Sequence, residues 1–122
     1  MTHARQSLGE QGERLACREL RRRGYAILAT RHRTRFGEID IVAQDGDTLV
    51  FVEVKARRTR DFGGALAAVG WRKQRRIINM ARSYLMGLTG PQPPVRFDVI
   101  GVTLATDERP TVEVVVDAFR AG

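Results

Sequence analysis

The chain has 122 residues, 43% of them hydrophobic, which is enough for one domain with a buried core and too few for two ordinary domains. We therefore expect a single domain over residues 1–122. It should not span a membrane, because no apolar run approaches the roughly 20 residues that a spanning helix needs. The 21 Lys and Arg exceed the 14 Asp and Glu, giving a net charge of +7.

The basic charge is concentrated in the first three quarters of the chain. Residues 97–122 hold two Arg and five acids, which leaves 19 basic and 9 acidic residues in residues 1–96. Charge of this sign attracts polyanions, above all nucleic acid. A solvated arginine-rich surface, or a ribosomal or acidic protein partner, would also explain the composition.

The beginning of the chain and its cysteine content bear on the compartment. The first residues lack the apolar stretch of a secretory signal. The one cysteine, Cys17, cannot form an internal disulfide, and no Cys/His spacing suggests zinc. We therefore expect a reduced, cytoplasmic protein.

The first elements are a helix and a strand. Ser7 and Glu10 have the spacing of a capping box, which predicts a helix that continues to about Arg23. Gly24 suits its C-terminal end. Residues 25–30 are typical of a strand, and we expect a basic loop over residues 31–35.

The remaining elements complete a mixed α/β pattern. Residues 37–43 and 48–56 predict two strands joined by a two-residue turn at Asp45-Gly46. A Gly-rich stretch, residues 59–70, predicts a mobile loop, residues 71–87 an amphipathic helix, and residues 95–104 and 111–119 two closing strands. The order αβββαββ predicts an α/β (α+β) fold, a central mixed sheet with its apolar strands covered by helices.

Four charged residues interrupt the two apolar strands of the predicted hairpin. Residues two apart in a strand share a face, so Glu38 lies with Asp40, and Glu53 with Lys55. A turn at Asp45-Gly46 gives a register in which paired positions sum to 91, and this register puts all four charges on one side. We expect the carboxyl oxygens of Asp40 and Glu53 to approach within roughly 4–6 Å, close enough to share one ion.

Three neighbouring acids predict a cation site. Clustered carboxylates raise one another's pKa values unless positive charge neutralises them, and Lys55 supplies only one charge. A donor set of oxygens without His or Cys favours Mg²⁺ or Mn²⁺. A carboxylate-bound metal at the centre of a basic surface is typical of a nuclease. The alternative is an exposed sheet face on which Lys55 forms a cross-strand salt bridge with Glu38 or Glu53.

These residues carry a family resemblance. The pattern resembles the PD-(D/E)xK nuclease superfamily, with Asp40 as the first acid and residues 53–55 as the (D/E)xK element, although Ile39 replaces the proline. Over nearly its full length the chain is similar to the YraN family of small bacterial proteins, which is related to archaeal Holliday-junction resolvases. This similarity is carried by the sequence blocks GEQGERLA, RGYAIL, GEIDIVA, FVEVKAR, ARSYL and RFDVI.

The resemblance implies a restriction-endonuclease-like core and a role for each residue of the site. Asp40, Glu53 and Glu13 would hold Mg²⁺ or Mn²⁺, since Glu13 follows Gly9 by the four residues seen in resolvases. From the sequence alone, the favoured interpretation of Glu13 is a solvated helix residue. Glu38 would act directly or through water, and Lys55 would orient or deprotonate the attacking water.

The expected partner is nucleic acid, DNA rather than RNA, in a branched or Holliday-junction-like form. A symmetric junction would favour a two-fold homodimer. Two alternatives stay open: a non-catalytic nucleic-acid-binding module on a nuclease fold, accessory to recombination, repair or RNA processing, and a basic protein-interaction domain. The residues expected to contact nucleic acid are Arg33, Arg35, Arg57, Arg58, Arg72, Lys73, Gln74, Arg75 and Arg76.

Overall fold

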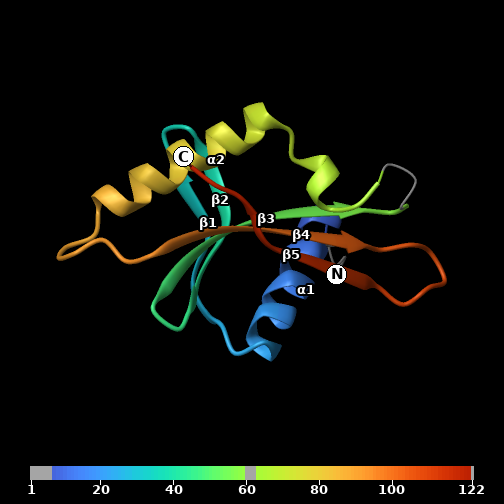
Figure 1. Cartoon of the computed structure of the whole chain (residues 1–122). Helices are drawn as coiled ribbons and strands as arrows, with labels where there is room; N and C mark the ends of the chain where they lie inside the picture. Colours follow the sequence, from blue (N-terminus) through green and yellow to red (C-terminus); the bar gives the residue numbers. More distant parts are fainter. Residues whose placement is uncertain (1–6, 60–62, 122) are drawn as a thin grey trace, which may run out of the picture.

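A computed structural model describes residues 7–59 and 63–121. It contains one five-stranded sheet of order β1-β2-β3-β4-β5, in which only β3 and β4 are parallel neighbours (Figure 1). The chain order αβββαββ and the mixed sheet confirm the predicted fold class. The elements are α1 (Leu8–Arg22), β1 (Ala26–Thr34), β2 (Gly37–Asp45), β3 (Thr48–Arg57), a short 3-10 helix (Leu66–Ala68), α2 (Trp71–Met86), β4 (Val95–Thr103) and β5 (Thr111–Phe119).

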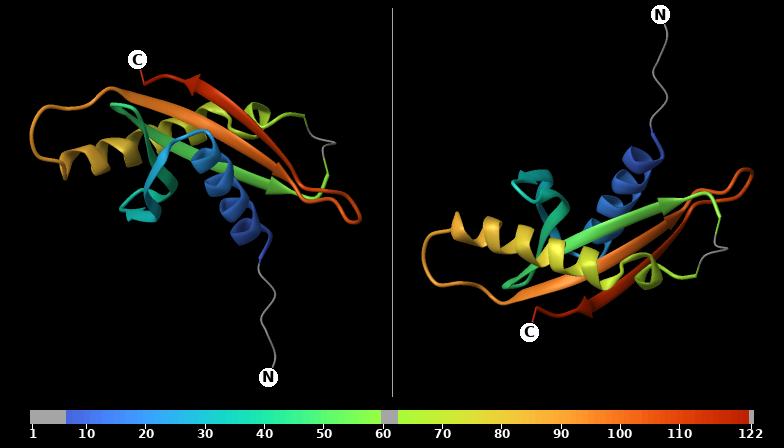
Figure 2. Two further views of the ribbon diagram at one scale, coloured as in Figure 1. Left: turned by 90° about the horizontal axis from the view of Figure 1, so that it is seen from below. Right: turned by 90° about the horizontal axis from the view of Figure 1, so that it is seen from above.

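The two helices lie on opposite faces of the sheet (Figure 2). On one face, Ile77, Met80 and Ala81 of α2 pack with Phe51 and Phe97 of the sheet. A second cluster on the other face contains residues of α1 together with the alternate side chains of β2, β3 and β4. A mixed sheet whose central strands are apolar on both faces needs this double cover.

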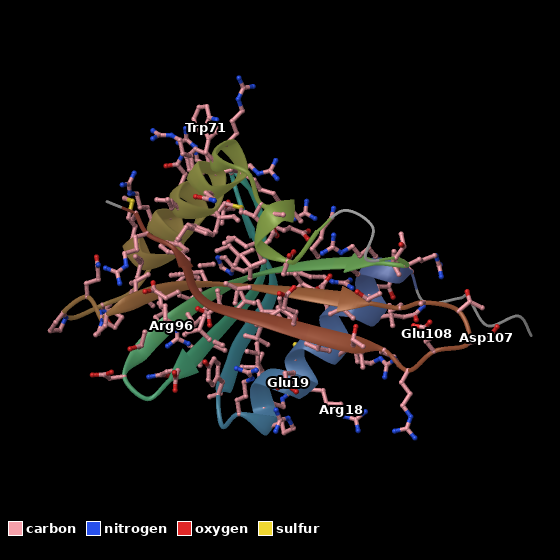
Figure 3. The ribbon with its side chains drawn as sticks, turned by 45° about the vertical axis from the view of Figure 1, so that its right-hand side comes forward. Arg18, Glu19, Trp71, Arg96, Asp107 and Glu108 are labelled. Atoms are coloured by element: carbon pink, nitrogen blue, oxygen red, sulfur yellow. The ribbon has the colours of Figure 1, made fainter. Side chains whose placement is uncertain are left out.

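α1 begins where the sequence predicts. Ser7 is the N-cap, and its hydroxyl accepts a hydrogen bond of 3.1 Å from the Glu10 backbone N–H. The buried stripe of the helix includes Ala16 and Leu20, whereas Arg18 projects from its outer face (Figure 3). Helical periodicity therefore separates a core face from a charged face.

β1 is longer than the sequence indicates. It continues through Thr34 and pairs with β2 as far as Thr34↔Gly37, so the expectation of a basic loop over residues 31–35 is wrong. Only Arg35 and Phe36 separate the two strands. β1 is an edge strand with many exposed residues. Its arginine-rich second half has no apolar run, so the sequence pattern did not predict that the strand continues there.

The β2–β3 turn lies one residue later than predicted. Asp45 pairs with Thr48, so the turn is Gly46-Asp47 and paired positions sum to 93, not 91. Gly46 has φ +62°, the backbone region that glycine adopts without strain, and it occupies the first turn position as in a type II′ hairpin. The sum of paired positions is still odd, so the register still places Glu38, Asp40, Glu53 and Lys55 on one side of the hairpin.

The connection from β3 to β4 crosses the sheet by way of α2. Part of the stretch predicted as a mobile loop forms the 3-10 helix Leu66–Ala68, while residues 60–62 lie outside the described residues. This segment packs closely on the sheet: a Cβ atom on Gly101 would lie 2.8 Å from the Cβ of Ala65. The close approach fixes the path of the chain into α2.

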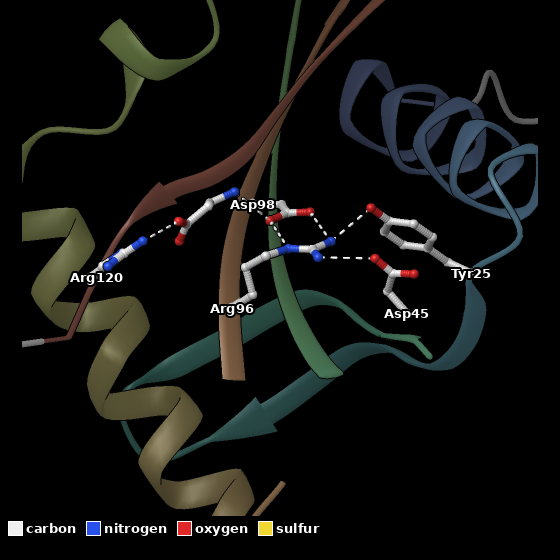
Figure 4. Close-up of polar contacts among 6 residues, drawn as sticks. Tyr25, Asp45, Arg96, Asp98 and Arg120 are labelled. Atoms are coloured by element: carbon white, nitrogen blue, oxygen red, sulfur yellow. Dashed lines mark hydrogen bonds and ion pairs between the residues drawn. The ribbon is translucent and has the colours of Figure 1, made fainter. Parts of the chain in front are cut away.

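Arg96 joins distant parts of the chain on the α1 side of the sheet (Figure 4). Its guanidinium donates two hydrogen bonds of 2.9 and 3.0 Å to Asp98, which is fully buried. It also donates to the Tyr25 hydroxyl at 2.7 Å and to Asp45 at 3.0 Å. Asp98 accepts a further bond from the Asp117 backbone N–H at 3.0 Å. The buried carboxylate thus has a counter-charge and several donors, as burial of a charge requires.

Candidate active site

The sheet opens where β2 and β3 part. Their pairing runs from the turn to Ile41↔Val52 and stops there, while β1–β2 pairing continues to Gly37 and β3–β4 pairing continues to Arg57. Ile39 and Ile41 are two residues apart yet pack in different core clusters, so β2 twists sharply at Asp40. The fork between the two strands is the floor of a cleft.

Beyond the last β2–β3 pair, the side chain of Asp40 accepts a hydrogen bond from the backbone of β3. Its Oδ2 accepts a hydrogen bond of 2.8 Å from the backbone N–H of Val54. The carboxylate therefore satisfies a main-chain donor that the parting of the strands would otherwise leave without a partner. This bond holds the Asp40 side chain over β3.

The cleft has a volume of about 460 Å³ and receives residues from α1, β2, β3 and α2. All four charged residues of the predicted hairpin line it: Glu38, Asp40, Glu53 and Lys55. Asp40 and Glu53 are the residues that directly follow the last β2–β3 pair, Ile41↔Val52, whereas the expected register made them diagonal neighbours.

Asp40 and Glu53 form a hydrogen-bonded carboxyl pair. Burial, then the hydrogen bond and charge of Glu53, raises the pKa of Asp40 to about 8, and the Val54 N–H and Lys73 oppose the shift. Glu53 is only 8% exposed. A hydrogen bond between two carboxyl groups requires a proton on one of them, so the pair holds a proton at neutral pH.

Lys73 is the cation that contacts this pair. Its Nζ lies 3.2 Å from Oε2 of Glu53, whereas Lys55 lines the cleft with an exposed side chain. The sequence predicted only a phosphate contact for Lys73. A compositional signal was available: the chain has two lysines among 21 basic residues, and both line this cleft. Lysine, unlike arginine, is a compact charge that can change protonation state.

The other two acids proposed for the site are paired elsewhere. Glu13 accepts a bond of 3.1 Å from Arg31 and does not line the cleft. Glu38 lines the cleft but is paired with Arg33 at 2.9 Å. Over residues 7–59 and 63–121, no group of three or more His, Cys, Asp or Glu side chains is arranged to hold a metal ion. Three of the four proposed acids therefore line the cleft, and one of these three, Glu38, is paired with an arginine.

The basic residues expected to bind nucleic acid divide into two sets. Arg72, Arg75 and Arg76 are exposed on α2, and Arg76 lines the cleft. Arg35 is exposed in the β1–β2 turn, with its guanidinium 5.0 Å from the centre of the Phe36 ring. These residues are available to an anionic partner, as is the exposed Arg58.

The second set has local contacts. Gln74 donates a 3.0 Å bond to the Val69 carbonyl and does not line the cleft. Arg57 lines a separate hollow of about 470 Å³, and its buried Nε has no hydrogen-bond partner among the described residues. A larger hollow of about 600 Å³ lies beside the C-terminal half of α2, but its Arg96 and Arg120 are already paired with aspartates. Among the described residues that line them, neither hollow contains a carboxyl pair.

Together, the fold and the cleft define a small α/β protein whose mixed sheet forks around a carboxyl pair, the half-buried Asp40 and the buried Glu53, in a cleft lined by two lysines. Residues 12–102 match the model of the uncharacterised protein family UPF0102, and the chain belongs to that family. This agrees with the YraN resemblance in its sequence.

Relatives of similar length support the assignment. A UPF0102 protein of Symbiobacterium thermophilum is 46% identical over 114 residues, which cover 93% of this chain and 97% of the relative. One from Anaeromyxobacter dehalogenans is 45% identical over 94% of this chain and 85% of its own, and one from Chlorobium limicola is 43% identical over 98% and 96%. None of the helices in the described part of the chain has the length and apolar character needed to cross a membrane.

Proposed function

We propose that this protein is a nuclease of the PD-(D/E)xK type that hydrolyses phosphodiester bonds in DNA, branched or Holliday-junction-like, with a divalent cation held by Asp40 and Glu53. One observation carries the proposal: the half-buried Asp40, whose pKa is raised to about 8, lies beside the buried Glu53 in a cleft lined by both lysines and Arg76. An ion pair between Lys73 and Glu53 with a purely structural role would not need Asp40 as a second acid beside it. Strongly perturbed carboxyl groups in a basic cleft are typical of functional sites.

The carboxyl pair fits Mg²⁺ or Mn²⁺. The pair holds a proton because two buried negative charges repel, and a divalent cation would neutralise both carboxylates in its place. Mg²⁺ commonly binds one or two protein carboxylates and completes its shell with water and substrate phosphate oxygens. When bound, the cation would lower the pKa of a water molecule and stabilise charge on the phosphoryl oxygens.

The residues of the chain would prepare the site and bind the substrate. The Val54 N–H fixes the Asp40 carboxylate, and Lys73 fixes Glu53. Lys55, exposed at the same cleft, can orient the attacking water or donate to a phosphate oxygen. Arg76 at the cleft and the exposed arginines of α2 would bind backbone phosphates without reading sequence.

A cleavage panel tests the proposal. Junction, flap, duplex and single-stranded DNA are incubated with the protein in Mg²⁺ and in Mn²⁺. Cleavage should be lost without divalent ions and should fall at least 100-fold in Asp40→Asn, Glu53→Gln and Lys55→Ala. Arg18→Ala removes an exposed charge on the opposite face of the sheet and should cleave normally. Equal cleavage by Asp40→Asn and the unmodified protein would contradict the proposal.

A second candidate is a non-catalytic nucleic-acid-binding module. The pairing of Glu13 with Arg31 and of Glu38 with Arg33 favours it, because each acid already has an arginine as its counter-charge. This candidate predicts salt-sensitive DNA binding with no cleavage in any metal. For either function a two-fold dimer would suit a symmetric junction, and sedimentation with and without junction DNA would measure it.

A further inference from the structure

Trp71, the first residue of α2, is unusually exposed. It is the only tryptophan of the chain, and 66% of its surface is accessible. Figure 3 shows it projecting from the end of the helix, away from the body of the protein. Tryptophan is usually buried to a large extent, so an indole left in solvent at a helix end indicates a contact surface.

The surroundings of the indole are cationic. The Arg72 guanidinium carbon lies 5.6 Å from the centre of the indole ring, a cation–π contact. The sequence of α2 contains no Asp or Glu. An apolar protein surface would not need an arginine over the ring, whereas a nucleobase attached to a phosphate would use both the indole and the guanidinium. Charge complementarity therefore favours nucleic acid as the occupant.

The basic residues connect Trp71 to the cleft. With about 100° of rotation per residue, Arg75, Arg72, Arg76 and Lys73 lie at roughly 40°, 100°, 140° and 200° from Trp71 around the helix axis. Lys73 contacts Glu53, and Arg76 lines the cleft. The first turns of α2 thus carry an arc of positive charge that begins at the carboxyl pair and ends at the indole.

We infer that Trp71 is a stacking platform for an unpaired base, so that the DNA bound by this protein includes a single-stranded segment that crosses the first turns of α2. A base within a duplex has both faces covered by its neighbours, whereas an unpaired base can stack on an aromatic side chain. The phosphates of the same strand would follow the arc toward the cleft. This inference rests on the function proposed for the cleft, and it specifies the form of the substrate.

The fluorescence of the single tryptophan reports directly on this contact. The full chain is titrated with a single-stranded oligothymidylate of about 12 nucleotides, and separately with a duplex of the same length, without divalent ions. The single strand should quench Trp71 in a saturable manner, and the duplex should leave its emission nearly unchanged. Equal quenching by both, or no quenching by either, would overturn the inference.

Variants separate stacking from simple charge attraction. Trp71→Ala should weaken single-strand binding about 5- to 150-fold, the effect of losing one base–aromatic stack, and duplex binding less than about 2-fold. Trp71→Phe should retain most of the affinity. Met86→Ala, at the opposite end of α2 and 87% exposed, is the matched control and should bind normally. Equal losses for both DNA forms in Trp71→Ala would contradict stacking, and circular dichroism checks that the variant is folded.

Two further outcomes keep this inference distinct from the proposed function. Asp40→Asn should abolish cleavage and leave the quenching by single strands intact. Cleavage without quenching would overturn only the role of Trp71, whereas quenching without any metal-dependent cleavage would overturn only the nuclease. A concentration-dependent blue shift of the emission without DNA would show that a second copy of the chain covers the indole, and would overturn the inference.

Discussion

Three features of the Asp40 environment act on its pKa in opposite directions. Asp40 is largely buried, it lies against a second carboxyl group, and it accepts a main-chain hydrogen bond from Val54. Burial and Glu53 favour its protonated form, and the bond from Val54 favours its ionised form. The first two effects prevail, which leaves a group that exchanges its proton near physiological pH.

The raised pKa of Asp40 predicts a loss of stability as the pH rises. Its folded pKa of about 8 lies above the usual 3.8, so the folded state binds the extra proton between these values. The free energy of unfolding should therefore fall as pH rises from about 4 to 8, by about 1.4 kcal/mol for each unit over which the difference persists. Asp40→Asn should flatten this dependence. Urea unfolding at several pH values measures both curves, and parallel curves would contradict the prediction.

Divalent ions should reverse this pH dependence. A cation binds the deprotonated pair, so its affinity should increase as pH rises toward and past 8. Excess Mg²⁺ or Mn²⁺ should then raise the melting temperature at pH 8.5 and have little effect at pH 5.5. Glu53→Gln should remove the metal effect, whereas Arg18→Ala should not. Equal stabilisation of all three proteins would indicate binding outside the cleft.

At the scale of elements, one helix is fixed to the sheet by a glycine. A Cβ on Gly12 would lie 2.5 Å from the Cβ of Ala56, so α1 meets β3 with no space for a side chain. Ala56 follows Lys55, and Gly9 of the same helix lines the cleft. The close packing at Gly12 therefore sets the distance between α1 and the wall of the site.

Gly12→Ala should separate α1 from β3. The added methyl group requires the helix or the strand to move, at a cost of about 1–3 kcal/mol in the free energy of unfolding. Gly9→Ala is the matched control, because nothing lies within 4 Å of its Cβ position, and it should stabilise by up to about 1 kcal/mol. Restoring the space in Gly12→Ala/Ala56→Gly should recover most of the loss. Thermal unfolding of the three variants tests the contact, and a stable Gly12→Ala protein would refute it.

At the scale of the whole molecule, Arg96 connects segments from both ends of the chain. It binds Tyr25 before β1, Asp45 at the β2–β3 turn and Asp98 on β4. These contacts lie on the α1 face of the sheet, opposite to α2. They keep the fully buried Asp98 neutralised and hold the hairpin that carries Asp40 against the rest of the sheet.

Arg96→Met should destabilise the entire fold. It removes the counter-charge of a buried carboxylate, a change that typically costs about 3–5 kcal/mol. Arg120→Ala breaks an exposed ion pair of 2.9 Å with Asp117 and should change stability by less than about 1 kcal/mol. Replacing the carboxylate as well, in Arg96→Met/Asp98→Asn, should recover part of the loss. Urea unfolding compares the variants, and similar effects for Arg96 and Arg120 would argue against a central role for Arg96.

The affinity of the whole basic surface for nucleic acid should depend on salt concentration. Contacts between arginine and phosphate release counterions, so affinity should fall steeply, by about 10-fold or more, between 50 and 200 mM salt. Neutralising Arg72, Lys73, Arg75 and Arg76 together should weaken binding to all sequences about equally. Fluorescence anisotropy with labelled DNA measures both effects. Affinity that is unaffected by salt would contradict the expected mode of binding.

The element order, the face shared by the four hairpin charges and the family could all be predicted from the amino-acid sequence. Capping at Ser7, strand alternation and helical periodicity are local properties, and an error of one residue in the turn left the parity of β2 and β3 unchanged. The basic surface also follows from composition alone. These features depend on neighbours along the chain.

Which of the charged side chains contact one another depends on the tertiary structure. Lys73 reaches Glu53 because the crossover places the start of α2 above the fork, while Glu13 and Glu38 pair with arginines of β1. The pKa of Asp40 depends on burial and on Glu53, and both arise when β2 twists away from β3. Hydrogen bonds and charge interactions act over a few ångströms between segments far apart in sequence, so pattern and spacing predicted the candidates for the site but not their partners.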